Sequence, residues 1–416
     1  MNLGKTYGIL LLLLVIISGC HNVSPQNKDS DFGRKPQEKT GKAKDKEAKP
    51  QEFSRFEDVS NSTSATSNQI INTEEIAEYY IPADKLDRIG LIGSRSVQTR
   101  HAGSAYVPGM LLQQQPDFFH NGLISNEVFL SLNVDNDLFD YQDWYYTSGQ
   151  RLEFYHPAIS RSPFSWILPS LPGSLNYFSI SIFQNLYTPT HLTRTNVLYG
   201  DRPFASYFCL GHNKYSFNAM RRMRLESAFD LGVIGPGALG MPAQDIFHSD
   251  TPIGWQYQVA NDVVVNYSIE FEKGFYHSDR VDMAFIAGGQ AGTLYDNLSG
   301  SFFLQVGKSN GRYSALFQTT PYETPFKKRI RFYFNLELEN KVVLYDATLQ
   351  GGMFNHSSIY TISDENVKRY VFTGRAGAGI GLGIYSMEIE QNFLTSEFDG
   401  GKHHFWFRIK NIIRLK

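Results

Sequence analysis

Apolar and polar residues alternate with a period of two from about Asn126 to the end of the chain, and no sustained helical stripe interrupts this pattern. Residues 263–272 and 330–339 are clear examples, with one set of side chains apolar and the other largely polar or charged. Alternation of this kind predicts β-strands whose two faces differ chemically. At roughly 20 to 25 residues for each strand and its turn, the roughly 290 residues of this region predict about twelve strands.

The alternation fits two architectures, a soluble β-sandwich and a membrane barrel whose apolar face meets lipid. Aromatic residues make up 14% of the chain, with 24 Tyr and 31 Phe, and there are 35 Gly but only 2 Cys. This composition is typical of a barrel with aromatic girdles rather than a disulfide scaffold. We therefore predict an all-β fold, a transmembrane antiparallel β-barrel over residues 126–416. Charged residues such as Glu337 and Glu339, opposite Arg329 and Arg331, are expected to line its interior.

The N-terminus reads as a targeting segment. Lys5 precedes an unbroken apolar run over residues 9–17, which is too short to span a bilayer and indicates a signal peptide over residues 1–19. The following Ile17-Ser18-Gly19-Cys20 resembles a bacterial lipobox, which implies cleavage before Cys20 and lipidation of its thiol. The alternative is an ordinary signal peptide that happens to contain a cysteine. If Cys20 is lipidated, Cys209 is a lone thiol in a strand.

Two further segments precede the barrel. Residues 20–67 are polar and densely charged and cannot bury enough apolar surface to fold, so we expect a disordered tether. Residues 68–125 are less regular and are expected to form an N-terminal extension, such as a short plug or periplasmic helix.

Charge and the motifs that do not occur narrow the chemistry. The net charge of −2 argues against a general nucleic-acid binder. The chain contains no Gly-x-Ser-x-Gly elbow, no His-Glu-x-x-His and no P-loop, so serine-nucleophile, zinc and nucleotide chemistries lose support.

Polar residues near the ends of predicted strands are the candidates for chemistry. His248 could act as a general base, although a lone histidine is more often structural. Gln244 lies four residues earlier, which places it beside His248 if the stretch is helical; it could orient water or the base, or cap the loop. Asn136 and Asp137 offer oxygen ligands for a hard cation such as Ca²⁺, or simply close a strand in an Asx turn.

Eight short segments occur in order along the barrel region: Asn136-Asp137-Leu138-Phe139, Tyr146-Thr147-x-Gly149, Gln184-Asn185-x-Tyr187-x-Pro189, Gly200-Asp201-Arg202-Pro203-Phe204-Ala205, Gly232-Val233-Ile234-Gly235-Pro236, Gln244-x-x-x-His248, Trp255-x-x-Gln258 and Thr395-Ser396-Glu397-Phe398. Together, in their order and spacing, they resemble the outer-membrane lipid A 3′-O-deacylase family.

The resemblance implies roles for several of these residues. It makes His248 the base and Gln244 a site residue, and it places Asn136 in the site beside Asp137, which would help to hold calcium. Thr147 matches a further site position, where its hydroxyl could bind the intermediate or a sugar group.

The chain departs from the family pattern at two of its site positions. Counting from the Gln184 motif, Arg194 stands where the family places a lysine, and a guanidinium is better suited to phosphate or an oxyanion. The loop after His248 is short, so the family's acidic residue maps only loosely, onto Asp250.

Two of the segments are interpreted as architecture. We expect Asp201 and Arg202 to form a buried ion pair that sets a loop, with Pro203 fixing the turn. The stretch from Gly232 to Pro236 is expected to end a strand sharply and to aim the Gln244–His248 loop into the mouth of the barrel.

The expectation is thus a lipid-anchored outer-membrane barrel that hydrolyses the 3′-linked acyloxyacyl ester of lipid A, the lipid of lipopolysaccharide, in the outer leaflet with Ca²⁺. A calcium-dependent outer-membrane phospholipase would share the barrel, the ester chemistry and the metal. A non-enzymatic porin or adhesin, with the polar cluster as a structural site, is the alternative from a different class.

Overall fold

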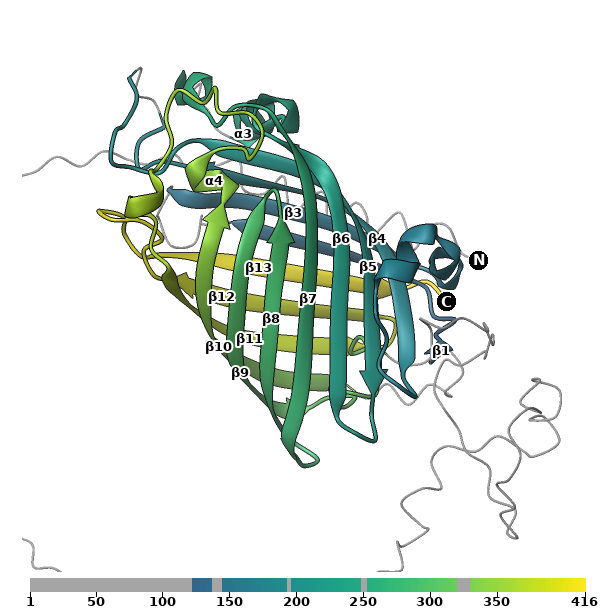
Figure 1. The fold of residues 1–416 in the computed structure, drawn as a ribbon. Coiled ribbons are helices and arrows are strands. Elements are labelled where there is room, and N and C mark those ends of the chain that lie inside the picture. The colour runs from purple at the N-terminus through teal and green to yellow at the C-terminus, as the bar shows by residue number, and fades with distance from the viewer. Residues whose placement is uncertain (1–121, 137–143, 193–195, 248–252, 320–329) are drawn as a thin grey trace, which may run out of the picture. The chain divides into compact units, whose positions relative to one another are not determined.

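The computed structural model describes residues 122–136, 144–192, 196–247, 253–319 and 330–416, all within the compact unit Glu78–Lys416. Twelve antiparallel strands, β2 to β13, form one sheet that closes on itself through the pairing of β13 with β2 (Figure 1). This confirms the predicted barrel and its number of strands. The short strand β1 (Leu123–Ile124) pairs in parallel with β4 outside this ring of neighbours.

The barrel strands are β2 (Phe129–Asn136), β3 (Tyr145–Tyr155), β4 (Leu175–Thr188), β5 (Ala205–Asn218), β6 (Met223–Ile234), β7 (Asp262–His277), β8 (Val281–Gly292), β9 (Tyr295–Lys308), β10 (Arg331–Asp346), β11 (Tyr370–Leu382), β12 (Tyr385–Leu394) and β13 (His404–Arg414).

The wall of the barrel is apolar outside and polar inside. Along β7, Val263 and Val265 are 54% and 37% exposed, whereas the intervening Val264 is fully buried. On β4, Ile180 is about half exposed and its neighbour Ser181 is buried. An exposed apolar exterior around a polar interior is the arrangement of a transmembrane barrel and the reverse of a soluble sandwich. The fold therefore resolves the ambiguity that alternation alone left open.

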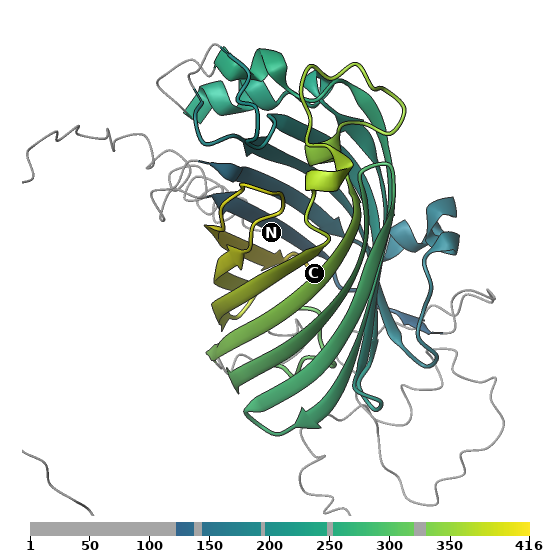
Figure 2. The same ribbon diagram turned by 60° about the vertical axis from the view of Figure 1, so that its left-hand side comes forward.

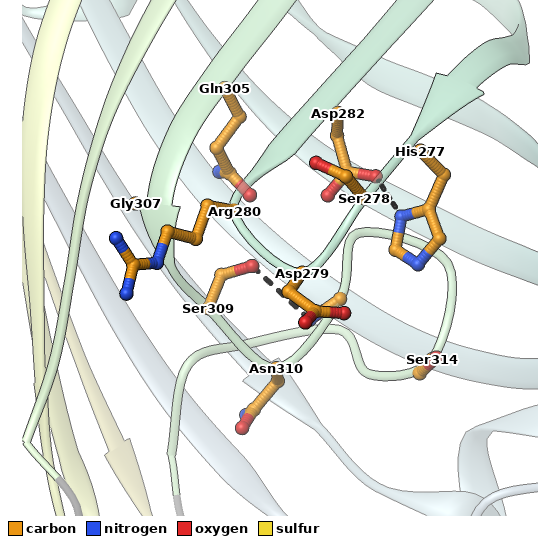
Figure 3. Close-up of a pocket in the computed structure, with 11 residues that line it drawn as sticks. His277, Ser278, Asp279, Arg280, Asp282, Gln305, Gly307, Ser309, Asn310 and Ser314 are labelled. Carbon is orange, nitrogen blue, oxygen red and sulfur yellow. Dashed lines mark hydrogen bonds and ion pairs between the residues drawn. The ribbon is translucent and has the colours of Figure 1, made fainter.

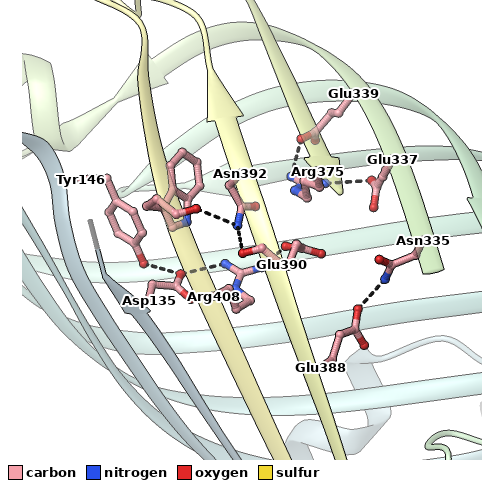
Figure 4. Close-up of polar contacts among 11 residues, drawn as sticks. Asp135, Tyr146, Asn335, Glu337, Glu339, Arg375, Glu388, Glu390, Asn392 and Arg408 are labelled. Atoms are coloured by element: carbon pink, nitrogen blue, oxygen red, sulfur yellow. Dashed lines mark hydrogen bonds and ion pairs between the residues drawn. The ribbon is translucent and has the colours of Figure 1, made fainter. Parts of the chain in front are cut away.

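Charged side chains cross the interior and pair there (Figure 4). Arg375 on β11 donates to Glu337 at 2.8 Å and to Glu339 at 2.5 Å, both on β10. The two glutamates line the interior as expected, but they pair with Arg375. Of the arginines expected opposite them, Arg331 donates to the carbonyl of Gln318 and Arg329 lies outside the described residues.

The two ends of the barrel differ. At one end, called here the turn end, tight turns join β5 to β6, β7 to β8 and β11 to β12, and the chain enters at β2 and leaves at β13. At the other, the loop end, longer connections carry η6 (Pro236–Ala238), α3 (Gly240–Phe247), η7 (Ile253–Tyr257), α4 (Ala347–Gln350) and η8 (Asp364–Asn366) (Figures 1 and 2). Short turns face the periplasm and long loops face outward in barrels of this type.

The connection after β9 folds back into the turn end of the lumen. Arg312 donates to Glu272 of β7 through Nε at 2.5 Å and Nη2 at 2.7 Å, and Tyr313 donates to the same carboxylate at 2.7 Å. Phe317 packs edge-on against Phe129, with ring centroids 5.1 Å apart. These contacts hold the connection across the interior at this end.

The described helices are all too short or too polar to cross a membrane. The predicted signal peptide, the lipidation site at Cys20, the tether and nearly all of the extension over residues 68–125 lie outside the described residues. Cys209 is buried in β5 and has no disulfide partner among the residues that the structure describes.

Candidate functional site

Five cross-strand neighbours form a row on the barrel wall near the loop end. The register pairs Phe407 on β13 with Asn136 on β2, and then runs through Ser148 on β3 and Leu186 on β4 to Ser206 on β5. Because adjacent strands lie about 4.8 Å apart, the row places Asn136 within about 10 Å of β4.

This row lies on the outer face of the barrel. Asp135 points into the lumen, where it accepts hydrogen bonds from Tyr146 Oη and Arg408 Nε, each at 2.8 Å (Figure 4). Its neighbour Asn136 therefore faces outward, because successive side chains of a strand alternate. The Arg408 contact also joins the last barrel strand to the first, one residue from Asn136.

A β-bulge interrupts β3 beside Asn136. The register of β3 against β4 shifts between Tyr146 and Ser148, so Thr147 is the extra residue. Its hydroxyl lies 2.6 Å from that of Thr188, at the end of β4, and both residues are buried. The bulge thus fixes the position of Thr147, a predicted site residue, through a hydroxyl pair that sequence reasoning missed.

The connection between β6 and β7 covers this part of the outer wall. Gln184, on the same face of β4 as the exposed Ile180 and Ile182, donates to the carbonyl of Ala238 in η6 at 2.5 Å. Gly240, the first residue of α3, approaches β5 so closely that a Cβ there would collide with Ser206. The described part of this connection, up to Phe247, therefore lies over the exterior rather than in the barrel mouth as predicted, and His248 lies outside the described residues.

Trp255 of η7 is the anchor of this layer. It is fully buried, and its ring packs against Phe204 at 5.2 Å between centroids and lies in one cluster with Leu186. Its indole Nε1 donates a hydrogen bond to Oε1 of Gln244 in α3. Because an indole nitrogen can only donate, this bond fixes which end of the Gln244 amide is the oxygen.

The nitrogen at the other end of the Gln244 amide has different surroundings. Gln244 is only 2% exposed, and its Nε2 has no hydrogen-bond partner among the residues that the structure describes. A buried donor without a partner costs about 1–3 kcal/mol, so such groups are usually matched by a partner or a ligand. Gln244 thus offers a fixed donor on the outer wall.

A buried ion pair lies inside the loop end and ties three connections together. Arg202, before β5, pairs with Glu397 of the β12–β13 connection and donates to Thr348 Oγ1 in α4 at 2.6 Å. Asp346 accepts from that same hydroxyl at 2.6 Å. Burial alone would lower the pKa of Arg202, but the charges of Glu397 and Asp346 raise it, so the guanidinium stays cationic.

Arg202 is buried as expected, but its partner is Glu397 rather than Asp201. Asp201 instead accepts from the backbone N–H of Thr190 at 2.9 Å and from its hydroxyl, which closes the loop that precedes β5. Arg202 and Glu397 are separated by 195 residues, and each belongs to a segment that the sequence singled out.

Three of the predicted site residues can be placed. Asn136, Thr147 and Gln244 all lie at the loop end, with the first two on adjacent strands and the third in the helix that covers the neighbouring wall. Gln244 lies within α3, so the stretch is helical as far as Phe247. Four predicted site residues lie outside the described residues: Asp137, Arg194, His248 and Asp250.

The donor chemistry around Asn136 suits a hard cation. The side-chain amide oxygen of Asn136 is a ligand of the kind that Ca²⁺ takes, and its neighbour in the register, Ser148, adds a hydroxyl oxygen beside it. Asp137, which follows Asn136 in the chain, would add the charged ligand that such a site needs.

A polar pocket of about 240 Å³ lies elsewhere, at the turn end between β7, β8 and β9 (Figure 3). His277 Nδ1 lies 2.6 Å from Asp282 Oδ1 there, which suggests half of a catalytic triad. The nearby serines serve the turns, however: Ser278 bonds the backbone of Val281, and Ser309 accepts from the N–H of Gly311. These two serines therefore shape the turns around the pocket.

Comparison with known proteins places this geometry in context. The family model described as "Outer membrane protein LpxR" matches residues 106–412. The solved structure of LpxR from Salmonella typhimurium is 20% identical, with a TM-score of 0.55, over 68% of this chain and 99% of that chain. That likeness shows the same fold.

Two other barrels are similar at a lower level. The β-domain of the Bordetella autotransporter BrkA is 10% identical, with a TM-score of 0.35, over 69% of this chain and 97% of that one. The KdgM porin in complex with disordered oligogalacturonate is 5% identical, with a TM-score of 0.30, over 70% and 99%. A search of curated protein sequences finds no match.

Proposed function

Because the chain belongs to the LpxR family of outer membrane proteins, we propose that it is a lipid A deacylase that removes the 3′-linked acyloxyacyl chain in the outer leaflet. The observation that carries the proposal is the unpartnered Nε2 donor of Gln244, held over the outer wall at the loop end, on the same stretch of wall as outward-facing Asn136. A buried donor in a layer that covers a lipid-facing wall is suited to binding an oxygen of a lipid substrate.

The outer wall gives an acyl chain a path to this position. Ile182, 48% exposed, lies four residues from Leu186 on β4, which corresponds to about 13 Å along the strand. Acyl chains packed against this apolar surface would place their ester groups level with the row through Asn136 and Leu186. The substrate would therefore reach the site from within the leaflet rather than through the lumen.

In the proposed reaction, His248 takes a proton from water as the water oxygen attacks the ester carbonyl carbon. The Nε2 of Gln244 donates to the oxyanion that forms, and Asn136 and Thr147 bind neighbouring oxygens of the intermediate or of the sugar. The bond from carbonyl carbon to sugar oxygen then breaks, and the imidazolium returns its proton to that oxygen. The products are a carboxylic acid and a sugar hydroxyl, with no acyl-enzyme.

Three further residues complete the proposed site. Asp137 and Asp250 would hold calcium, which when bound supplies polarisation of the ester carbonyl. Arg194 remains cationic and donates as a planar fork, so we assign it to recognition of a substrate phosphate or of the oxyanion.

The filled interior argues against the porin alternative. Arg375 pairs with Glu337 and Glu339 across the lumen, and Arg312 and Tyr313 bind Glu272 at the turn end. Such charge networks occupy the space that a conducting channel needs. A phospholipase would use the same outer wall, so the products of the reaction must decide between the two lipids.

The test is a mass spectrum of lipid A from a Gram-negative host that expresses the full chain, with calcium present and with His248→Ala as the matched control. We expect loss of the two acyl chains of the 3′ acyloxyacyl group, abolished in the control. Unchanged lipid A from a folded, inserted barrel would contradict the proposal. If lysophospholipids accumulate in the same sample, the enzyme is a phospholipase instead.

A further inference from the structure

A second feature of the exterior lies at the turn end. Residues 157–172, here called the strap, connect β3 to β4 and contain η4 (Pro157–Arg161) and η5 (Pro163–Ile167). The strap lies outside the wall, beside β4 and β5 (Figures 1 and 2, blue).

The strap runs along β5 and forms hydrogen bonds with every second residue over part of that strand. Ser165 Oγ lies 2.8 Å from His212 Nε2, and Lys214 Nζ donates to the carbonyl of Leu168 at 2.9 Å. Further along, the N–H of Leu171 donates to Ser216 Oγ at 2.9 Å, and Asn218 Nδ2 donates to the carbonyl of Pro172 at 2.8 Å. Every second side chain of this half of β5 is therefore bonded to the strap.

These side chains belong to the outward-facing set of β5. Leu210, two residues before His212, is 55% exposed on the exterior, whereas the intervening Gly211 and Asn213 belong to the inward set; Asn213 bonds to Glu153 and Ser179 in the lumen. Without the strap, an imidazole and an ammonium group would face the surroundings of the barrel, and a charged group in hydrocarbon costs several kcal/mol. With it, Lys214 is completely buried.

The strap presents apolar side chains on its own outer surface. Phe164, Trp166 and Ile167 are 45%, 60% and 49% exposed. Phe164 stacks on Phe229 of β6, with centroids 5.5 Å apart, and Tyr267 of β7 donates to the carbonyl of Ile167 at 3.0 Å. The strap thus covers a polar patch of the barrel wall and presents an apolar surface in its place.

The apolar patch continues the surface that meets lipid. The register aligns exposed Ile182, Leu210, Leu231 and Val265 in one row across β4 to β7. The next outward row towards the turn end contains His212, Phe229 and Tyr267, all contacted by the strap. Successive outward rows are about 7 Å apart, so the strap borders the lipid belt directly.

We propose that the strap is an interfacial anchor, in which Phe164, Trp166 and Ile167 enter the phospholipid interface of the leaflet at the turn end. Tryptophan favours this boundary because its ring is apolar and its N–H is polar. The lipid is the partner, since the strap is continuous with the lipid-facing rows and its polar groups turn inward to β5. The proposal is independent of the chemistry at the loop end.

Tryptophan fluorescence can test the anchor, because the chain has only 4 Trp and Trp166 is the most exposed of them. Trp255 is fully buried, Trp406 is 8% exposed and Trp144 is half-buried at the loop end. The full chain is inserted into phosphatidylcholine vesicles whose acyl chains carry bromine at shallow or deep positions. We expect shallow bromines to quench more strongly than deep ones.

Two variants assign the signal. Trp166→Phe should remove most of the bromine-quenched emission while preserving the apolar surface, and Trp144→Phe, the matched control, should leave it in place. Retention of heat-modifiable migration on gels shows that each barrel is folded. The anchor is overturned if Trp166→Phe leaves bromine quenching unchanged, if aqueous iodide quenches Trp166 instead, or if deep bromines quench it most.

Discussion

The two ends of the Gln244 side chain differ in chemistry, and Trp255 determines which end is free. The indole Nε1 can only donate, so it holds Oε1 and leaves Nε2 to bind something else. The amide would otherwise be able to rotate and present either atom. A single buried indole therefore decides that the position acts as a donor.

Gln244→Glu tests this donor directly. A glutamate has nearly the same shape and can still accept from Trp255, but it cannot donate and it brings negative charge towards the developing oxyanion. We expect kcat for lipid A deacylation to fall by about 10²–10³-fold, as for loss of an oxyanion donor, with the barrel still folded. Gln290→Glu, on β8 across the barrel, is the matched control and should keep its activity.

Trp255→Phe in both backgrounds separates orientation from packing. In the otherwise unchanged protein it should cost up to about tenfold in kcat, the worth of one neutral hydrogen bond. In the Gln244→Glu background it should cost little more, since the donor is already lost. Equal losses in both backgrounds would show that Trp255 supports only the fold.

Some of these residues could be predicted from the sequence and others could not, for physical reasons. Asn136 stands where an alternating strand ends, and Gln244 lies four residues before His248, so local pattern and spacing are enough to single out both. The bond from Trp255 to Gln244 depends on how an 11-residue stretch folds over the wall. The pair of Arg202 and Glu397 spans 195 residues, and no local pattern specifies so distant a partner.

At the scale of elements, the loop end is organised by one buried cation. Arg202 joins the β4–β5, β10–β11 and β12–β13 connections through Glu397 and Thr348, and its aromatic neighbour Tyr187 lies 4.3 Å from its guanidinium carbon. The β6–β7 connection, by contrast, is held on the outside by Trp255. The barrel wall at the loop end is therefore held by the Arg202 contacts on its inner face and by the Trp255 contacts on its outer face.

Glu397→Gln should weaken the contacts of Arg202 inside the loop end. It leaves the Arg202 cation buried with a neutral partner, and breaking a buried pair in this way costs about 3 kcal/mol. Since the pKa of Arg202 is raised, the cation cannot escape this cost by losing its proton at neutral pH. We expect a fall of several degrees in the midpoint of heat-induced unfolding, followed by gel migration.

Lys402→Gln is the control for this change, because Lys402 lies in the same connection and stacks over Trp144 with its ammonium 5.0 Å from the ring centroid. Its removal should shift the midpoint by much less, since exposed charge contacts contribute little. If both variants unfold at the temperature of the unchanged protein, the Arg202 pair does not stabilise the loop end.

For the molecule as a whole, the interior is a packed polar core rather than a pore. Charged pairs cross it at mid-height, and the connection after β9 occupies the turn end through Arg312, Tyr313 and Phe317. The reconstituted protein should therefore give no steady conductance in a planar lipid bilayer. Stable porin-like current steps, compared with a porin in the same bilayer, would contradict the filled interior.

The barrel and its number of strands could be predicted from the sequence better than the individual contacts of its side chains. Alternation and length indicate about twelve strands, because the period of two and the residue count per strand are local properties, and the composition then favours a barrel. They do not indicate which side of the sheet meets lipid, which the exposed Val263 and buried Val264 decide. The strap was not predicted because its bonds to His212 and Lys214 join residues that are 47 and 46 positions apart in the chain.

The seam between β2 and β13 has a consequence for the timing of activity. Arg408 binds Asp135 across this seam, one residue from Asn136, so the first and last strands of the barrel meet at the edge of the proposed site. A chain still on its way into the membrane, with its last strand unpaired, carries Asn136 on a free sheet edge. The proposed site is therefore complete only when β13 has paired with β2, so the proposed activity should appear only in the closed barrel.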